Sequence, residues 1–310
     1  MNNKIYYGSS INRARPFIKW AGGKRQLLKE LTASLPQFKD YHEPFIGGGA
    51  LFFELYNKNL LKHANLYDYN EELITTYKVV KENPLALIEE LQNTVYKNNK
   101  ATFYSIRSKI PTDIVKRAAR FIYLNHTSYN GLYRVNANGV FNVPFGNYKN
   151  PRFFEKDVIQ ADSKALQKAE LYSGDFSAVL HHANPGDLVY FDPPYNPLSK
   201  TSSFTSYTSA DFNSKDQERL ANVVKSLDKR GCFVMLSNSS TELVRSLYEG
   251  YHFRTVYANR AINCKANGRG KIAELIITNW ETNQPQKKLA TEASVHLEEL
   301  VPLKPHSGHM

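Results

Sequence analysis

Apolar and polar positions follow strand and helix spacings in two regions of this 310-residue chain. In the first region, YHEPFIGGGALFFELY (residues 41–56) predicts a short strand, a glycine turn and a helix. The next stretch, ANLYDYNEELITTYKVVKEN (residues 64–83), predicts a strand that ends at Asp68, followed by a helix with one apolar face. Both stretches therefore have the order strand, turn, helix.

The second region repeats this order closer to the C-terminus. DLVYFD (residues 187–192) predicts a strand, and apolar residues from Leu220 to Leu227 predict a helix that ends near Gly231. CFVMLS (residues 232–237) and AELIITN (residues 273–279) predict two more strands. Alternation of this kind predicts an α/β fold with a doubly wound, mostly parallel sheet.

A segment of different character separates the two regions. Pro84 and Asp113 mark the starts of two predicted helices, and the stretch after them is rich in Asn, Gly, Tyr and Arg. Asn130-Gly131 and Asn138-Gly139 predict two hairpin-like turns. We therefore expect an inserted, mainly helical module that carries a β-hairpin.

These patterns give a predicted domain organisation. Residues 15–82 and 159–282 form one α/β domain, and residues 83–158 form the insertion. We expect residues 1–14 to be a flexible terminus and the polar tail, residues 283–310, to be disordered.

The inserted module also carries most of the charge. The chain has a formal net charge of +11, and ten lysines and arginines but one acid, Asp113, lie between Lys97 and Arg152. A run of charge is often only a solvated surface. Its concentration in under a fifth of the chain favours a polyanionic partner, and Lys116 is a candidate for a lysine that contacts phosphate.

Composition excludes several other classes of protein. No apolar run is long enough to cross a membrane and no apolar leader is seen at the N-terminus, so we expect a cytoplasmic protein. Cys232 and Cys264 are the only cysteines, and they lack metal-ligand spacing. We expect neither a disulfide framework nor a metal site.

Two glycine-containing segments indicate a ligand site. Gly47, Gly48 and Gly49 lie between a predicted strand and helix, where the backbone can approach a ligand closely. Asp68 ends the next strand, where an acid can accept hydrogen bonds from a ribose diol. A helix N-cap is the alternative role for Asp68. Upstream, WAGGK places Trp20, Gly22 and Lys24 at the start of another helix.

The strand at residues 187–192 leads directly into Asp192, Pro193, Pro194 and Tyr195. The two prolines stiffen the chain and so fix the acid, the carbonyl groups and the aromatic ring at the strand end. The amino group of adenine is a poor nucleophile because its lone pair is delocalised into the ring. Asp192 and the carbonyl of Pro193 can accept its two N–H bonds, and Tyr195 can stack on an extruded base.

Four segments in this order resemble the DNA adenine-N6 methyltransferases of the Dam and DpnII/MboI type, the D12 class of the α group. They are FIKWAGGKRQLL, EPFIGGGALFF, LNHTSYNGLYRVNANGVFNVPFGNYKNP and YFDPPYNPLSKTSSFTSYT, and the resemblance covers about residues 15–280. It implies a methyltransferase fold with an inserted target-recognition domain, S-adenosylmethionine as cofactor without a metal, and duplex DNA with GATC as the usual target. It also implies a monomer on DNA, and a cognate restriction endonuclease acting separately where the enzyme belongs to a restriction-modification pair.

The resemblance carries site roles onto matching positions of this chain. The catalytic set comprises Asp192, Pro193, Pro194 and Tyr195. The cofactor-contacting set comprises Trp20, Gly22, Lys24, Glu43, Phe45, Gly47, Gly49, Asp68, Asp175, Phe176 and Asp192. The DNA-contacting set comprises Lys19, Tyr129, Asn130, Arg134, Asn142, Pro144 and Lys149, with Tyr129 at the gap left by the flipped adenine.

Other functions remain open at this stage. Tyr129 could be a core aromatic, and Arg134 could contact phosphate without specifying sequence. Ribosomal RNA adenine or cytosine-N4 could be the methylated group, although those classes usually carry another residue in place of Asp192. A DNA-binding module with an inactive methyltransferase fold is a non-enzymatic alternative, which the intact Asp192 and Tyr195 disfavour.

Overall fold

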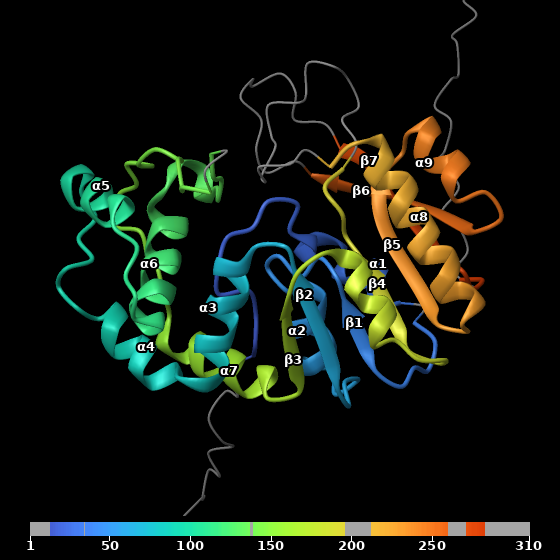
Figure 1. Ribbon diagram of the computed structural model, residues 1–310, viewed down its shortest axis with the longest axis horizontal. Helices are drawn as coiled ribbons and strands as arrows, with labels where there is room; N and C mark the ends of the chain where they lie inside the picture. The colour runs from blue at the N-terminus through green and yellow to red at the C-terminus, as the bar shows by residue number, and fades with distance from the viewer. Residues whose placement is uncertain (1–12, 34, 137–138, 196–211, 260–270, 283–310) are drawn as a thin grey trace, which may run out of the picture.

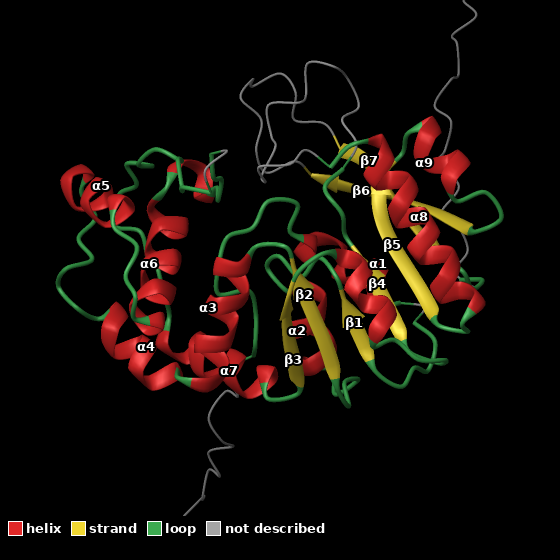
Figure 2. Cartoon of the chain, in the orientation of Figure 1, coloured by secondary structure: helices red, strands yellow, loops and turns green. Residues whose placement is uncertain are grey.

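The computed structural model describes residues 13–33, 35–136, 139–195, 212–259 and 271–282. Its centre is a seven-stranded sheet with the order β3-β2-β1-β4-β5-β7-β6 (Figures 1 and 2). The strands are β1 (Tyr41–Glu43), β2 (Ala64–Asp68), β3 (Ala169–Ser173), β4 (Leu188–Phe191), β5 (Phe233–Ser239), β6 (His252–Asn259) and β7 (Lys271–Thr278).

The sheet is parallel from β3 to β5, and β7 runs antiparallel between β5 and β6. The prediction of a doubly wound, mostly parallel sheet is therefore confirmed. Strands β3 and β6 were not predicted, because β3 is short and partly exposed and β6 interleaves its apolar residues with polar ones. The antiparallel direction of β7 brings its amino end to the edge where the parallel strands end.

Helices cover both faces of the sheet and bury two separate clusters of apolar side chains. One cluster joins the sheet to helices α1 (Leu28–Thr32), α2 (Ala50–Asn57), α3 (Glu71–Glu82) and α7 (Lys156–Leu166). The other joins it to α8 (Ser214–Lys229), α9 (Glu242–Leu247) and the 3-10 helix η3 (Phe176–His181). Successive residues of β4 alternate between the clusters, with Leu188 and Tyr190 in the first and Val189 and Phe191 in the second.

The insertion lies beside the β3 end of the sheet, far from α8 and α9 (Figure 1). It contains α4 (Pro84–Leu91), α5 (Lys100–Ser108) and α6 (Ile114–Thr127), of which α5 was not predicted. Helix α6 packs on α3, and buried residues of both belong to one apolar cluster. The insertion is therefore joined to the α/β part of the chain by a shared core.

The loop after α6 departs from the predicted hairpins. Asn130 and Gly131 both have positive φ and form a tight turn, but this turn follows the end of α6 and joins no pair of strands. Ser128 instead bridges to Phe145. A narrow hairpin does form around the second predicted turn, with Val135 bridged to Phe141, although Asn138 lies outside the described residues.

The last two residues of the predicted flexible terminus, Arg13 and Ala14, make contacts with α2. Within residues 1–14, Arg13 forms an ion pair with Glu54, and the backbone N–H of the buried Ala14 donates to Asn57. The polar tail after residue 282 lies outside the described residues.

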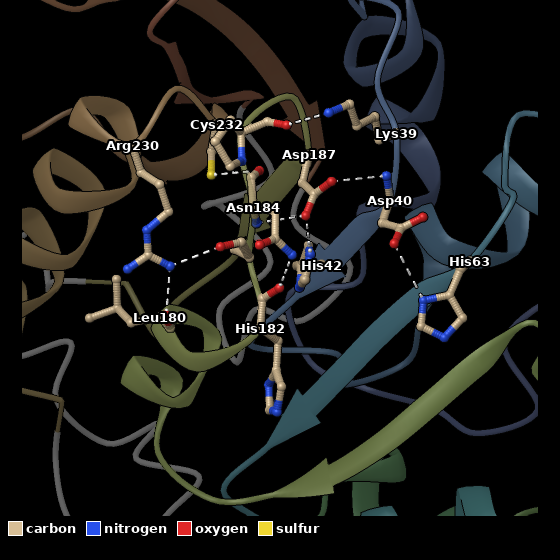
Figure 3. A network of polar contacts seen from close by, with 12 residues as sticks. Lys39, Asp40, His42, His63, Leu180, His182, Asn184, Asp187, Arg230 and Cys232 are labelled. Carbon is tan, nitrogen blue, oxygen red and sulfur yellow. Dashed lines mark hydrogen bonds and ion pairs between the residues drawn. The ribbon is translucent and has the colours of Figure 1, made fainter.

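A buried polar network crosses the sheet away from the strand ends that carry the predicted site (Figure 3). Asp187, just before β4, accepts from the backbone N–H groups of Asp40 and Asn184 and is 3.1 Å from Nε2 of His42. The hydroxyl of Tyr67 lies 3.4 Å from the other ring nitrogen of His42. This network ties β1, β2 and β4 together.

Candidate active site and DNA-facing loop

Asp192 lies where β4 ends, and a lysine from the first helical turn of the chain holds it. The side chain of Lys24 is 5% exposed, and its Nζ lies 2.9 Å from Oδ1 of Asp192. The same ammonium donates to the carbonyl of Gly22 at 2.8 Å. The structure therefore brings together two predicted residues that are far apart in the sequence.

Burial sets the protonation behaviour of Asp192. It raises the pKa of this carboxyl to about 6, and the neighbouring Lys24 ammonium opposes the rise. The group is therefore mostly ionised at neutral pH and can act as a hydrogen-bond acceptor.

Tyr195 is fixed by contacts on its ring and its hydroxyl. Its ring centroid lies 4.8 Å from Nζ of Lys24, and its hydroxyl donates to Oε2 of Glu274 at 2.8 Å. The carbonyl of Pro194 accepts a long hydrogen bond from Gln217. Glu274 was not predicted as a site residue, although an acid within the apolar run AELIITN was a usable signal.

The glycine turn before α2 lies directly against Trp20. Gly47 and Gly49 have φ of +45° and +68°, a region that glycine enters without a steric penalty. A Cβ on Gly47 would lie 2.5 Å from the Trp20 ring. Trp20 in turn stacks on Tyr133 of the insertion at 5.9 Å between ring centroids. The predicted ligand turn and the insertion therefore share one aromatic contact.

Asp68 closes the other side of the glycine turn. It accepts hydrogen bonds from the backbone N–H groups of Gly47 and Asn70, at 3.1 Å and 2.9 Å. The N-cap of α3 is Asn70, so the N-cap role considered for Asp68 is wrong. Burial raises the pKa of Asp68 to about 6, so ionisation of this carboxyl costs stability. A helix cap would not require that cost.

Aromatic rings form a wall next to this turn. Phe45 stacks on Phe176 at 5.5 Å, and Phe212 meets both rings at 5.9 Å. Arg219 of α8, another residue the sequence did not indicate, lies over Phe176 and forms a double hydrogen bond with Asp175. The segment Asp175-Phe176 is therefore held from the α8 side.

Glu43 differs from the other predicted cofactor contacts. It is buried in β1, accepts a hydrogen bond from the hydroxyl of Tyr41, and burial raises its pKa well above the usual range. The described contacts make it a core carboxyl that feels the charge of Asp192, with no described surface for a ligand.

These groups fit an adenosyl cofactor with an amino-acid end. Each oxygen of Asp68 has one described backbone donor and can accept further hydrogen bonds, as a ribose diol requires. Phe45, which is partly exposed, offers an apolar contact for a purine, and Lys24 offers a buried positive charge. Among the described residues no group of three or more His, Cys, Asp or Glu could hold a metal ion.

On the insertion side, Lys19 is anchored by an unpredicted residue. Asn125, fully buried in α6, accepts from the backbone N–H of Lys19 and donates to its carbonyl, both at 2.8 Å. The Lys19 ammonium lies 4.7 Å from the ring centroid of Tyr148. Partial burial lowers the pKa of Lys19. The segment before the first helical turn and the insertion thus hold this lysine jointly.

The other predicted DNA contacts lie on the loop after α6 and the hairpin that follows it. Tyr129 is 50% exposed, which excludes the core-aromatic alternative. Arg134 donates through Nε to Oδ1 of Asn142 across the narrow hairpin, at 2.8 Å. Asn130, Pro144 and Lys149 are exposed on the same segment. The structure therefore places these predicted residues on one stretch of surface loop.

Not every basic residue of the insertion faces solvent. Arg117 forms an ion pair with Glu72, and the buried Arg120 donates to the carbonyls of Ile106 and Arg107 at the end of α5. These two arginines are structural, so the charge available to a polyanion is smaller than the sequence count.

Known proteins of one family match most of this chain. Residues 20–262 match the family model described as D12 class N6 adenine-specific DNA methyltransferase. A Type II methyltransferase of Lactococcus lactis subsp. cremoris is 46% identical over 275 residues, which cover 86% of this chain and 95% of the relative. A Type II methyltransferase of Methanocaldococcus jannaschii is also 46% identical, over 86% of this chain and 99% of the relative.

The DNA adenine methylase of Escherichia coli K12 is 36% identical, over 86% of this chain and 95% of the relative. The fold and the matched family define a DNA-modifying methyltransferase. Within that class, the chain belongs to the D12 class of N6 adenine-specific DNA methyltransferases. No helix in the described part of the chain is both long and apolar enough to span a membrane.

Proposed function

We propose that this enzyme methylates N6 of an adenine flipped out of duplex DNA, with GATC as its target. The observation that carries the proposal is the buried Asp192 at the carboxyl end of β4, held by Lys24 and followed by the fixed ring of Tyr195. This arrangement offers an acceptor and a stacking surface where an extruded base could enter.

The proposed chemistry is direct attack by the amino nitrogen. Asp192 and the carbonyl of Pro193 accept the two N–H bonds of the adenine amino group, which returns its lone pair to nitrogen. S-adenosylmethionine supplies an electrophilic methyl group. The new N–C bond would replace the S–C bond of the cofactor, and the amino group would lose one proton to solvent, so the protein would form no covalent intermediate.

We assign the cofactor to the surface beside the glycine turn. Asp68 would hold the ribose hydroxyls, and Phe45, Asp175 and Phe176 would border the adenine. The main chain at Gly47 and Gly49 allows close approach, as does Gly22 near Trp20 and Lys24, which would face the amino-acid end. Glu43 would act indirectly, because its buried side chain would fix the shape of the end of β1 beneath the cofactor.

We assign DNA contact to the loop after α6. Tyr129 and Asn130 would occupy the gap that the flipped base leaves, and Lys19 and Arg134 would contact guanine edges, whose N7 and O6 accept from lysine and arginine. Asn142 and Pro144 would position this hairpin, and Lys149 would contact phosphate. The exposure of Tyr129 and the Arg134–Asn142 hydrogen bond support the assignment.

Relatives named Type II methyltransferase and DNA adenine methylase both match. We propose that the chain acts as a cytoplasmic monomer that marks double-stranded DNA, either against a separate cognate endonuclease or as a solitary methyltransferase.

The test is transfer of labelled methyl groups from S-adenosylmethionine to three matched duplexes. One contains GATC, one carries the same bases scrambled, and one has the GATC adenine replaced. We expect N6-methyladenine in the first duplex alone, identified by mass spectrometry of the hydrolysed DNA. Methylcytosine, or equal labelling of the scrambled duplex, would contradict the proposal.

A further inference from the structure

A glutamate on the antiparallel strand reaches the catalytic segment from the far side. Glu274 pairs in register with Ser239, at the carboxyl end of β5, and with Val256 of β6. Because β7 is antiparallel, its fourth residue lies at the edge where β4 releases Asp192. Every other described strand of the sheet runs parallel to β4 and therefore begins at the opposite edge.

One oxygen of Glu274 contacts two parts of the site. Oε2 accepts from the Tyr195 hydroxyl at 2.8 Å and lies 3.9 Å from Nζ of Lys24. Lys24 lies 2.9 Å from Asp192 and 4.8 Å from the Tyr195 ring centroid. The side chain of Glu274 is 15% exposed, so water screens these contacts little.

We propose that Glu274 is a positioning residue for the catalytic segment, holding the phenol of Tyr195 and sharing the Lys24 ammonium with Asp192. The proposal rests on the function proposed above and adds a second carboxylate beside Lys24. Glu274 does not touch the transferred methyl group.

The two contacts have separate consequences. The hydrogen bond fixes the rotation of the Tyr195 ring and therefore the plane on which a base would stack. The second negative charge competes for Lys24, so the ammonium neutralises Asp192 less completely. Asp192 then keeps more of its capacity to accept from an amino group.

The charges around Asp192 predict the direction in which its pKa changes when Glu274 is replaced. Lys24 lowers the pKa of Asp192, and the charge of Glu274 raises it. Removing that charge must lower the pKa of Asp192, so its ionised form persists to more acidic pH. The titratable or charged groups that act on Asp192 or feel its charge are Lys24, Tyr41, Glu43, Tyr190, Tyr195 and Glu274.

The first experiment is a double-mutant cycle on single-turnover methyl transfer to a GATC duplex. Glu274→Leu, Tyr195→Phe and the double variant are compared with wild type. If both residues act through one hydrogen bond, we expect each single variant to lose about tenfold and the double variant to lose little more than Glu274→Leu. S-adenosylmethionine affinity is measured separately for each variant, because Glu274 lies 3.9 Å from Lys24, which is assigned to the cofactor.

The second experiment uses Glu274→Gln, which keeps an acceptor for Tyr195 but removes the charge. We expect the acid limb of its pH–rate profile to move to lower pH. Glu170→Gln is the matched control, since Glu170 is also a strand glutamate paired with a lysine, Lys81, but lies on β3 away from Asp192. Thermal unfolding of each variant confirms that it is folded.

Additive losses in the cycle, or an acid limb that does not move in Glu274→Gln, would overturn the proposal. If Glu274→Leu does not fold, the pH profile of Glu274→Gln decides alone. If the wild type methylates GATC and the Glu274 variants have the same rate and pH profile, only the role of Glu274 is refuted. A wild-type enzyme that does not methylate adenine refutes the proposed function itself.

Discussion

At the scale of single residues, two carboxyl groups combine burial with a charge that function requires. Asp68 and Asp192 end the strands on either side of β1, and burial raises the pKa of each to about 6. A carboxyl whose pKa is higher in the folded than in the unfolded chain destabilises the fold once it ionises. Such a cost is typical of functional sites.

The first prediction concerns Asp192 and its chemistry. Asp192→Ala removes a preorganised acceptor, and we expect single-turnover methyl transfer to fall at least ~10²-fold. The fold should persist and DNA affinity should change far less, because the end of β4 is held by buried neighbours. Filter binding and a rapid-quench assay separate these quantities. Activity within about threefold of wild type would refute the assignment.

The second prediction concerns the stability cost of Asp68. Ionisation of Asp68 lowers the free energy of unfolding by its full amount above pH ~6, and this cost is absent below the unfolded pKa of ~3.9. The stability that the neutral carboxyl provides is therefore lost as the pH rises through ~6. In Asp68→Asn the difference in Tm from wild type should be more positive at pH 8 than at pH 4, by about 3 °C or more. Calorimetry at both pH values measures it. An equal difference at both would show that Asp68 ionises without a cost.

At the scale of elements, the loop after α6 combines rigid anchoring with exposed contact groups. Asn125 fastens it to Lys19, and the Asn130-Gly131 turn directs Tyr129 towards solvent. Lys116, a candidate phosphate contact from the sequence, lies at the opposite end of α6, about 20 Å along the helix from Tyr129. Lys149, on the loop itself, is the better candidate.

The third prediction separates base contacts from phosphate contacts within this loop. Arg134→Ala should reduce discrimination between GATC and its one-base variants by ~1–3 kcal/mol. Lys149→Ala should weaken all duplexes alike and reduce the salt dependence by about one unit of slope. Lys116→Ala is the control and should change neither. The measurement is kcat/KM on the set of duplexes at two salt concentrations.

If Arg134→Ala lowers kcat/KM equally on every duplex, Arg134 is a backbone clamp. Sequence discrimination must then come from Lys19 or Tyr129.

At the scale of the whole molecule, the proposed chemistry and a stabilising polar network lie at opposite ends of the parallel strands. The ends of β2 and β4 carry Asp68 and Asp192, whereas the Asp187 network at the start of β4 joins neighbouring strands (Figure 3). Asp187 is 3% exposed and accepts two backbone N–H groups as well as facing His42.

The fourth prediction follows from this division. Asp187→Ala leaves two backbone donors and His42 without their acceptor, and the free energy of unfolding should fall by about 3 kcal/mol. Methyl transfer per folded molecule should be unchanged. Asp40→Ala is the control, because the Asp40 side chain is 43% exposed and its one described side-chain contact, with Nδ1 of His63, is 3.8 Å long. Urea denaturation measures the loss. Equal stability of the two variants would show that the network is dispensable.

The sequence by itself determined most of the local elements and the residue types of the proposed site. Period-two and helical spacing predicted β1, β2, β4, β5 and β7, and the prolines after Asp192 marked the catalytic segment, because these signals depend on neighbours along the chain. The tertiary structure alone decided which distant groups meet. It paired Lys24 with Asp192, brought Glu274 to Tyr195 and buried Arg120, since strand order and the antiparallel direction of β7 are set by packing between segments.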